Sequence, residues 1–367
     1  MRVTTPPFDA SHLTTMPQAP DSLWLGDETS IAVPMTIRAG RPFIDAILDG
    51  HPATILVDTS AVTTLVDNDL IDAGDAISLQ IDQVRFPHLS PQVAAVRNYT
   101  QANLGAPADA IVGTDLLSRY PVQFDFPDRM LTIYRDSQSA AGAMPKTAVP
   151  AAMRIIDGRP AVEASLDGDA GLWFSLATGV AGDISLEPDA DRAAHLARQP
   201  SLPYDVIAPA GTTSGRLVRA KAFALGGVTF YQPLIVIVNA ERPGSELAGA
   251  LGADMLSRLD LFVDQSASTV SFVAGPGTTS ARLYDPSGIL LQTRRDQIVI
   301  RAIVPGSPAD AMRLRPGDQI LSINGLAPAT LEFARTLLDG NPGSKVLIVY
   351  RRWDLTRTAT LQLRVLI

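Results

Sequence analysis

The residues with the clearest chemical potential are one carboxylate and two hydroxyls at the end of a short apolar run. Residues 55–57 read Ile-Leu-Val and lead directly into Asp58-Thr59-Ser60-Ala61. An apolar strand that ends in a tight turn of small and hydroxyl residues holds its carboxylate at a fixed point. A second acid facing Asp58 would share one proton with it, because like charges at that range do not both ionise. One acid would then donate a proton while the other activates water as a general base.

A related run occurs later in the chain, but without the carboxylate. Residues 174–176 read Phe-Ser-Leu and are followed by Ala177-Thr178-Gly179-Val180. The Thr and the small residue after it recur in the same order, and Ala177 stands at the position of the acid. The alternative for Asp58 is a turn acid that accepts hydrogen bonds from backbone N–H groups, which is common for Asp. The duplication described below favours the catalytic interpretation.

The composition leaves carboxylates and hydroxyls as the groups available for catalysis. The chain of 367 residues contains no Cys, which excludes disulfides, thiolate nucleophiles and thiolate metal sites. Its four His are dispersed along the chain, and we expect neither a metal nor another cofactor. With 30 basic and 38 acidic residues the formal net charge is −8. This balance argues against a nucleic-acid partner, because phosphate binding requires a basic surface.

An internal duplication must position the two turns. Residues 40–50 contain the triplets Gly-Arg-Pro and Leu-Asp-Gly, and both recur within 158–168 at an offset of 118. Residues 113–119 (Gly-Thr-Asp-Leu-Leu-Ser-Arg) recur as 252–258 (Gly-Ala-Asp-Met-Leu-Ser-Arg) at an offset of 139. The order is kept while the offset grows by 21 residues, so the second copy carries an insertion. We predict a duplicated domain rather than a short-period solenoid.

Each copy is predicted to be mostly β strand. Residues 42–48 and 53–57 are apolar runs separated by an Asp-Gly turn, which predicts a hairpin. Residues 113–119 predict a short helix with Thr114 or Asp115 as its cap. The stretch 137–150 is rich in Ser, Ala, Gly and Pro and is the expected linker between the copies.

The expected organisation has four parts. They are an N-terminal extension at 1–30, a first lobe at 31–136, a second lobe at 151–274 and a third unit at 283–367, with a second linker at 275–280. In the third unit, strands are predicted at 298–304, 319–323 and 345–350, and helices at 308–314 and 331–338.

The turn and its surroundings resemble the retropepsin-like aspartic proteases. Asp58-Thr59-Ser60-Ala61 is similar to the family's Asp-Thr-Gly/Ser-Ala motif. Residues 111–113 and 250–252 resemble its second element, two apolar residues and a Gly behind the active-site turn. The resemblance covers about 31–274 as two lobes in one chain, as in pepsin-like enzymes. It implies a mostly β fold of two β-barrel lobes and endopeptidase activity on peptides or proteins. The catalytic pair would lie at Asp58 and position 177, supported by Thr59, Ser60, Thr178 and Gly179.

Ala177 departs from the family's pattern, which has Asp at this position. Asp58 alone does not supply both an acid and a base. One hypothesis is that the chain is an inactive Asp-to-Ala form of a working endopeptidase, which the intact Thr178 and Gly179 favour. The other is a natural pseudo-protease that acts as a peptide-binding or scaffolding protein. A third possibility is that Asp183 or Asp189 supplies the acid, although neither lies at the mirrored turn.

The insertion in the second copy contains a Gly-bounded polar segment. Its residues are Gly211, Thr212, Thr213, Ser214 and Gly215. Gly at both ends of a polar tip predicts a hairpin, and the resemblance implies a flap that closes over the substrate. The first copy has no similar segment, so one flap is expected. A plain surface hairpin is the alternative.

The third unit resembles a PDZ domain of the bacterial type. The matching stretches are 287–291, 302–309 and 314–325, in which Pro-Gly-Asp and Asn-Gly mark turns. Such domains bind an extended peptide as an added strand beside a helix, with loop N–H groups holding a C-terminal carboxylate. The resemblance implies a C-terminal peptide ligand, with 331–338 as the helix and Gly288, Ile289 and Leu290 as the loop. A packing module with an empty groove is the alternative.

The sequence leaves the cellular compartment open. No stretch approaches the ~18 to 20 apolar residues of a membrane span. Residues 1–23 are polar and Pro-rich, without the apolar centre of a signal peptide. A removed signal would leave the same appearance, and in that case a periplasmic or secreted location is expected.

Overall fold

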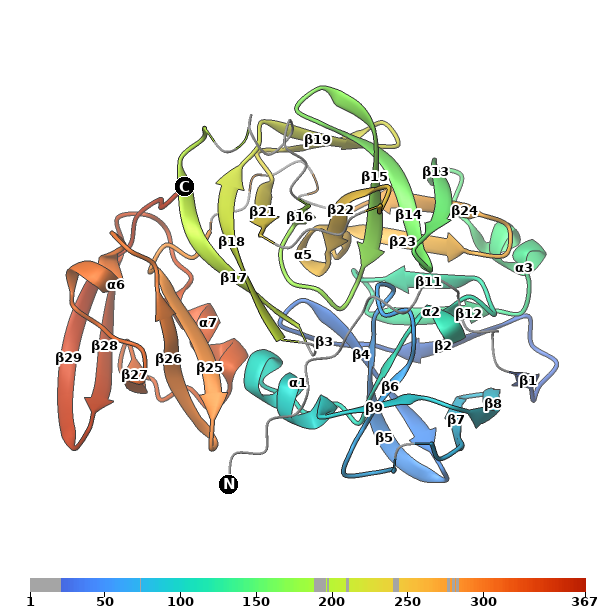
Figure 1. Ribbon diagram of the computed structural model, residues 1–367, viewed down its shortest axis with the longest axis horizontal. Helices are drawn as coiled ribbons and strands as arrows, with labels where there is room; N and C mark the ends of the chain where they lie inside the picture. Colours follow the sequence, from blue (N-terminus) through green and yellow to red (C-terminus); the bar gives the residue numbers. More distant parts are fainter. Residues whose placement is uncertain are drawn as a thin grey trace.

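The computed structural model describes residues 21–367, except 73, 188–195, 197, 209–210, 240–243, 276–277, 279–280 and 282–283. These residues form mostly β strands, arranged as two lobes and a smaller C-terminal unit (Figure 1). The mostly β fold class expected from the sequence is thereby confirmed. Residues 1–20 of the expected extension lie outside the described part. In the described part of the extension, β1 (Leu23–Trp24) pairs with β8 (Val84–Leu89) of the first lobe.

The first lobe is organised around the hairpin of β4 (Arg41–Leu48) and β5 (His51–Val57). Asp49 and Gly50 both have positive φ, 47° and 79°, as its two-residue turn requires. Strand β5 runs parallel to β10 (Ala110–Val112), which also pairs with β6 (Leu65–Asp67). The remaining strands are β3 (Thr36–Arg38), β7 (Ile77–Ile81), β8 and β9 (Gln92–Ala94).

The second lobe repeats this plan. The hairpin of β14 (Arg159–Leu166) and β15 (Asp169–Ala177) is followed by the parallel pairing of β15 with β22 (Leu247–Gly252). Its counterparts of β6 to β9 are β16 (Ile184–Leu186), β19 (Ala222–Leu225), β20 (Val228–Tyr231) and β21 (Leu234–Val238). The insertion forms a long hairpin of β17 (Ser201–Ala208) and β18 (Gly211–Arg219), placed between β16 and β19.

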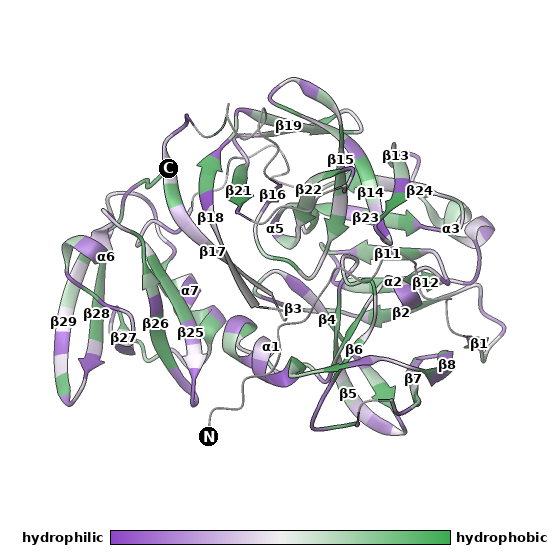
Figure 2. Ribbon diagram, viewed as in Figure 1, coloured by the Kyte–Doolittle hydropathy of each residue, from purple (hydrophilic) through white to green (hydrophobic). Residues whose placement is uncertain are grey.

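A continuous sheet joins the lobes about a two-fold axis. Its central strands are β11 (Val122–Asp125) and β23 (Leu259–Asp264), flanked by β12 (Met130–Tyr134), β2 (Ser30–Pro34), β24 (Thr269–Ala274) and β13 (Val149–Ile156). Val122 pairs with Val263, and Phe124 pairs with Leu261. At the repeat offset of 139, Leu261 is the counterpart of Val122 and Val263 that of Phe124, so the pairing is its own mirror image. These four side chains belong to the core shared by both lobes, and the joining strands carry long hydrophobic stretches (Figure 2).

Two local features differ from what the sequence suggested. The expected linker at 137–150 is structured, because 137–143 form helix α3 (Ser137–Ala143) and Val149 begins β13. The Asp136 carboxylate starts that helix by accepting the Ser139 N–H at 2.7 Å. Helix α2 (Thr114–Leu117) has Gly113 as its N-cap and no side-chain cap. Asp115 instead accepts both the N–H and the hydroxyl of Thr64 at 2.8 Å, tying the helix to the strand beside it.

The C-terminal unit is a five-stranded sheet with its own core. The strand order is β25 (Ile289–Arg294), β26 (Gln297–Ile303), β27 (Gln319–Ile323), β28 (Lys345–Arg352) and β29 (Leu355–Gln362), with helices α6 (Pro308–Ala311) and α7 (Leu331–Leu338). Helix α7 has the predicted bounds, and Thr330 caps it by accepting the Phe333 N–H. Strand β25 is an edge strand, and among the described residues no strand pairs with its outer side.

Helix α1 (Val96–Leu104) was not expected from the sequence. It lies between the first lobe and the C-terminal unit, close to β25 and α7 (Figure 1). The short helix α5 (Ala253–Leu256) is the second lobe's counterpart of α2. No helix in the described part of the chain is long and apolar enough to cross a membrane.

Candidate active site

The turns that follow β5 and β15 are locked together by their two Thr residues. Thr59 Oγ1 donates to the Leu176 carbonyl and Thr178 Oγ1 donates to the Val57 carbonyl, both at 2.8 Å. The Thr59 N–H donates to Thr178 Oγ1 at 3.1 Å, and the Thr178 N–H donates to Thr59 Oγ1 at 3.2 Å. Both Thr residues are fully buried. Each bond has its mirror image, so the two turns face each other across the same two-fold axis.

Asp58 is held at this junction by donors from both lobes. Its Oδ1 accepts the Ser60 N–H at 2.8 Å, the Ser60 hydroxyl at 2.7 Å and the Gly179 N–H at 3.2 Å. A Cβ added to Gly179 would lie 2.4 Å from Asp58 Cγ, so no larger residue fits there. The structure therefore brings Asp58 together with all four supporting residues predicted from the sequence.

The stretches 111–113 and 250–252, each two apolar residues followed by a Gly, lie directly behind the turns. A Cβ on Gly113 would lie 2.4 Å from the Ala61 oxygen, and a Cβ on Gly252 would lie 2.3 Å from the Gly182 oxygen. The Asp58 N–H donates to the Val112 carbonyl at 3.0 Å. Each Gly thus allows a strand to run close behind its turn and support it.

Position 177 is the geometric counterpart of position 58. The turns close in the same way, with Ala61 N–H donating to the Asp58 carbonyl (3.2 Å) and Val180 N–H donating to the Ala177 carbonyl (3.1 Å). Ala177 is fully buried and presents only a methyl group. The paired turns therefore carry a carboxylate at only one of two symmetry-related positions.

Asp183, one of the two acids considered as substitutes, does not lie at this place. The Asp183 carboxylate is buried, accepts the Leu234 N–H at 3.1 Å and forms an ion pair with Arg258 at 3.1 Å. A buried acid committed to such a pair holds the structure together rather than activating water. Asp189 lies outside the described residues.

Two supporting hydrogen bonds between the lobes were not predicted from the sequence. The Arg159 side chain donates from Nε to the Ser60 carbonyl at 2.8 Å, and the Thr114 hydroxyl donates to the Gly158 carbonyl at 2.9 Å. Residues of the second lobe's Gly-Arg-Pro triplet therefore position the first lobe's turn. The recurrence of this triplet was the available signal, although its partner across the interface was not readable from the chain.

A cavity of about 480 Å³ adjoins the turn after β15 at Val180 and reaches the C-terminal unit. Burial raises the pKa of the Tyr99 hydroxyl, Arg41 opposes that effect, and the Asp58 charge adds to it. Tyr99 is therefore within electrostatic reach of both Arg41 and the candidate catalytic acid. Among the described residues no cluster of His, Asp or Glu is suited to hold a metal ion. The cavity is lined on its lobe side by Arg41, Tyr99, Val180, Gly182 and Leu217, and on its other side by Ile289, Leu290, Arg335 and Leu338.

The expected flap residues lie in one arm of the hairpin that the insertion forms. Residues 211–215 form the first half of β18 and pair with β17, with Gly211 opposite Ala208. Residues 209–210 lie outside the described residues. Gly215 sits where a Cβ would approach the Ile237 carbonyl to 2.6 Å, so this Gly serves sheet packing. Movement of the hairpin over a substrate stays a prediction.

The predicted PDZ loop directly precedes and opens β25. Gly288 has φ of +73°, and Ile289 and Leu290 are the first residues of the strand. The Asp285 carboxylate accepts the N–H groups of Ser287 (2.9 Å) and Gly288 (3.3 Å), and Ser287 Oγ accepts the Ile289 N–H (3.2 Å). Burial raises the pKa of the Asp285 carboxyl, while the hydrogen bonds from Ser287 oppose this effect.

Comparisons with known proteins match one family model and solved structures of two kinds. Residues 299–352 match the family model of the PDZ domain. An aspartic proteinase from Irpex lacteus is 12% identical over 68% of this chain and 99% of that chain, with a TM-score of 0.43. A retropepsin-like aspartic protease from Rickettsia conorii is 15% identical over 34% and 88%, with a TM-score of 0.25. The PDZ domain of a carboxy-terminal protease from Vibrio cholerae is 24% identical over 22% and 92%, with a TM-score of 0.19.

No curated protein matches the sequence. The paired turns, the two-fold sheet and the C-terminal unit are present together in one described chain. In this arrangement the chain resembles a two-lobed aspartic protease followed by a PDZ domain.

Proposed function

We propose that this chain is built as an aspartic endopeptidase for peptide or protein substrates, with one acid of its catalytic pair replaced by Ala177. The observation that supports this most strongly is the reciprocal bonding of Thr59 and Thr178, because it sets position 177 opposite Asp58. Bonds of this kind fix two turns at a short and reproducible separation. Such a separation is what two carboxylates need in order to share a proton.

An acid at position 177 would complete the pair by symmetry. Asp58 accepts the N–H of its own turn, from Ser60, and an acid at 177 would meet the corresponding N–H of Gly179. Asp58 also accepts a hydrogen bond from the Ser60 hydroxyl. An acid at 177 would have no equivalent donor, because Gly179, the counterpart of Ser60, has no side chain. This additional donor favours the anion on Asp58, so the shared proton would reside on residue 177. Asp58 would then act as the base toward water while residue 177 donates to the substrate carbonyl.

The second candidate is a peptide-binding protein without catalysis. Ala177 itself favours this function, because it removes the second acid while the cavity beside the turns is kept. Asp183 does not replace the acid, since Arg258 and the Leu234 N–H occupy its carboxylate.

The substitution Ala177→Asp separates the two candidates. Cleavage of unfolded casein is measured by mass spectrometry between pH 3 and 6 for the parent and for Ala177→Asp. Two matched controls are Ala177→Asn, which has the same size but no acid, and Ala177→Asp combined with Asp58→Asn. We expect Ala177→Asp to cleave at least about 100-fold faster than each control, the lower end of general acid–base effects. Equal and negligible cleavage in all four proteins would reject the endopeptidase and leave the binding function.

A further inference from the structure

In the loop at the start of β25, three backbone N–H groups already donate hydrogen bonds within the loop. Asp285 and Ser287 accept the N–H groups of Ser287, Gly288 and Ile289 within the loop. A peptide ending in a carboxylate would compete for these same groups and would approach the negative charge of Asp285. The loop is therefore poorly suited to a terminal carboxylate.

The groove beside this loop is contacted by the end of helix α1. Arg335 on α7 donates from Nη2 to the Asn103 carbonyl at 3.1 Å. A Cβ on Gly105, the C-cap of α1, would lie 2.8 Å from the Leu331 Cβ on the same face of α7. Helix α1 also packs against β25, the other wall of the groove (Figure 1). An internal segment of the first lobe thus touches both walls between which a PDZ domain holds its ligand.

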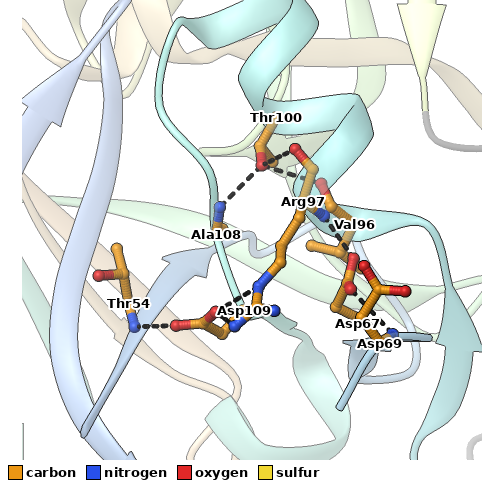
Figure 3. Close-up of polar contacts among 8 residues, drawn as sticks. All are labelled: Thr54, Asp67, Asp69, Val96, Arg97, Thr100, Ala108 and Asp109. Atoms are coloured by element: carbon orange, nitrogen blue, oxygen red, sulfur yellow. Dashed lines mark hydrogen bonds and ion pairs between the residues drawn. The ribbon is translucent and has the colours of Figure 1, made fainter. Parts of the chain in front are cut away.

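The other end of α1 is fastened to the first lobe. Asp67 accepts the Arg97 N–H at 2.6 Å, and Asp109 accepts the Arg97 side chain while also accepting the Thr54 N–H at 2.7 Å (Figure 3). Thr100 joins the helix to the following segment by accepting the Ala108 N–H at 2.8 Å. Because α1 is held in this way, a change in its contact with the groove would displace the C-terminal unit and not the helix.

We propose that the PDZ groove recognises an internal polypeptide segment, held without a terminal carboxylate, and that the end of α1 is its resident occupant. An extended segment of another polypeptide would displace α1 and move the C-terminal unit away from the first lobe. Arg41 and Tyr99 line the same cavity as Arg335 and Leu338, so this movement opens that cavity. The inference goes beyond the proposed protease function and does not depend on cleavage.

A substitution at Gly105 tests this with a matched control in the same chain. Gly105→Leu places a side chain against Leu331, whereas Gly50→Leu carries the same backbone strain with no neighbour within 4 Å. The two glycines have φ of 76° and 79°. The probe is a fluorescein-labelled peptide of residues 99–108 (Tyr-Thr-Gln-Ala-Asn-Leu-Gly-Ala-Pro-Ala), made as a free acid and as an amide. Its binding to each full-length protein is followed by fluorescence anisotropy.

We expect Gly105→Leu to bind the probe about tenfold more tightly than the parent and Gly50→Leu. The acid and amide forms should bind equally within about twofold. Equal affinity in all three proteins, absence of binding in all three, or a tenfold preference for the free acid would overturn the proposal.

A cysteine pair provides the second test if Gly105→Leu does not fold. The chain has no Cys, so Gly105→Cys with Leu331→Cys allows one bridge only. Their Cβ separation of 2.8 Å needs an increase of about 1 Å to reach that of a disulfide. We expect this pair to oxidise, with probe binding lost in the oxidised form and recovered on reduction, and Gly50→Cys with Leu331→Cys to remain free. Failure of the first pair to form a disulfide would contradict the proposal. Equal probe binding in the oxidised and reduced forms would also contradict it.

Discussion

Removing the hydroxyl of Thr59 should weaken the junction between the lobes in a way that depends on Thr178. In Thr59→Val the shape of the side chain is kept while the hydroxyl is lost. The Leu176 carbonyl then loses a donor and the Thr178 N–H loses an acceptor, and both groups are buried. A buried polar group left without a partner costs about 1–3 kcal/mol. The expected loss in the free energy of unfolding is therefore about 2–6 kcal/mol.

The assay is a double-mutant cycle measured by urea unfolding. Trp24 and Trp173, one in each lobe, report unfolding of the lobes by fluorescence. Thr59→Val and Thr178→Val should each destabilise the lobes, and together they should cost less than the sum. The reason is that the two hydroxyls also contact each other at 3.5 Å, so the first substitution already removes the bond that both side chains share. The expected coupling is about 1 kcal/mol or more.

Thr100 provides the matched control. Its buried hydroxyl also donates to a carbonyl, that of Val96, and accepts a backbone N–H, that of Ala108, both at 2.8 Å. It lies wholly within the first lobe, so Thr100→Val combined with Thr178→Val should be additive. If Thr59→Val and Thr178→Val are also additive within about 0.5 kcal/mol, the reciprocal bonding is not what joins the two turns.

Three further substitutions test the surroundings of the site. Gly113→Ala should lower the free energy of unfolding by about 3 kcal/mol, because its Cβ would meet the Ala61 oxygen; unchanged thermal melting would refute the close approach. Asp183→Asn should cost about 1.5–3 kcal/mol by removing the buried charge that pairs with Arg258, and a neutral result in urea unfolding would show that the pair is dispensable. Burial raises the pKa of Asp260 to about 6, so its protonated form stabilises the fold at low pH and this contribution is lost between about pH 4 and 6. Asp260→Asn should therefore raise the Tm relative to the parent more at pH 7 than at pH 4, and an equal change at both pH values would contradict the assignment.

Features governed by neighbouring residues were predictable from the sequence. The turn at Asp49 and Gly50 follows from its residue types, because both positions need positive φ. Helix α7 follows from Thr330 and the apolar spacing after it. The candidate site was predictable for a different reason, namely that the duplication aligns Thr59 with Thr178 and so implies their symmetric contact.

Features governed by contacts between distant segments were not predictable. The stretch 137–150 is rich in small and breaking residues, yet Asp136 caps a helix there and pairing with β24 orders its end. Asp115 has the type and position of a helix cap, but its carboxylate accepts a hydrogen bond from Thr64, 51 residues earlier in the chain. Helix α1 is polar over most of its length, and its place against α7 depends on the fit of two surfaces.

The most direct test of the paired site is the pH dependence of kcat/KM for cleavage by Ala177→Asp. Two acids that share a proton titrate as a pair, and only the singly protonated form supplies both a base and an acid. We expect a bell-shaped profile with both limbs, and loss of all cleavage when Asp58→Asn is added. A profile with one limb, or cleavage that survives Asp58→Asn, would show that Asp58 and position 177 do not form a catalytic pair.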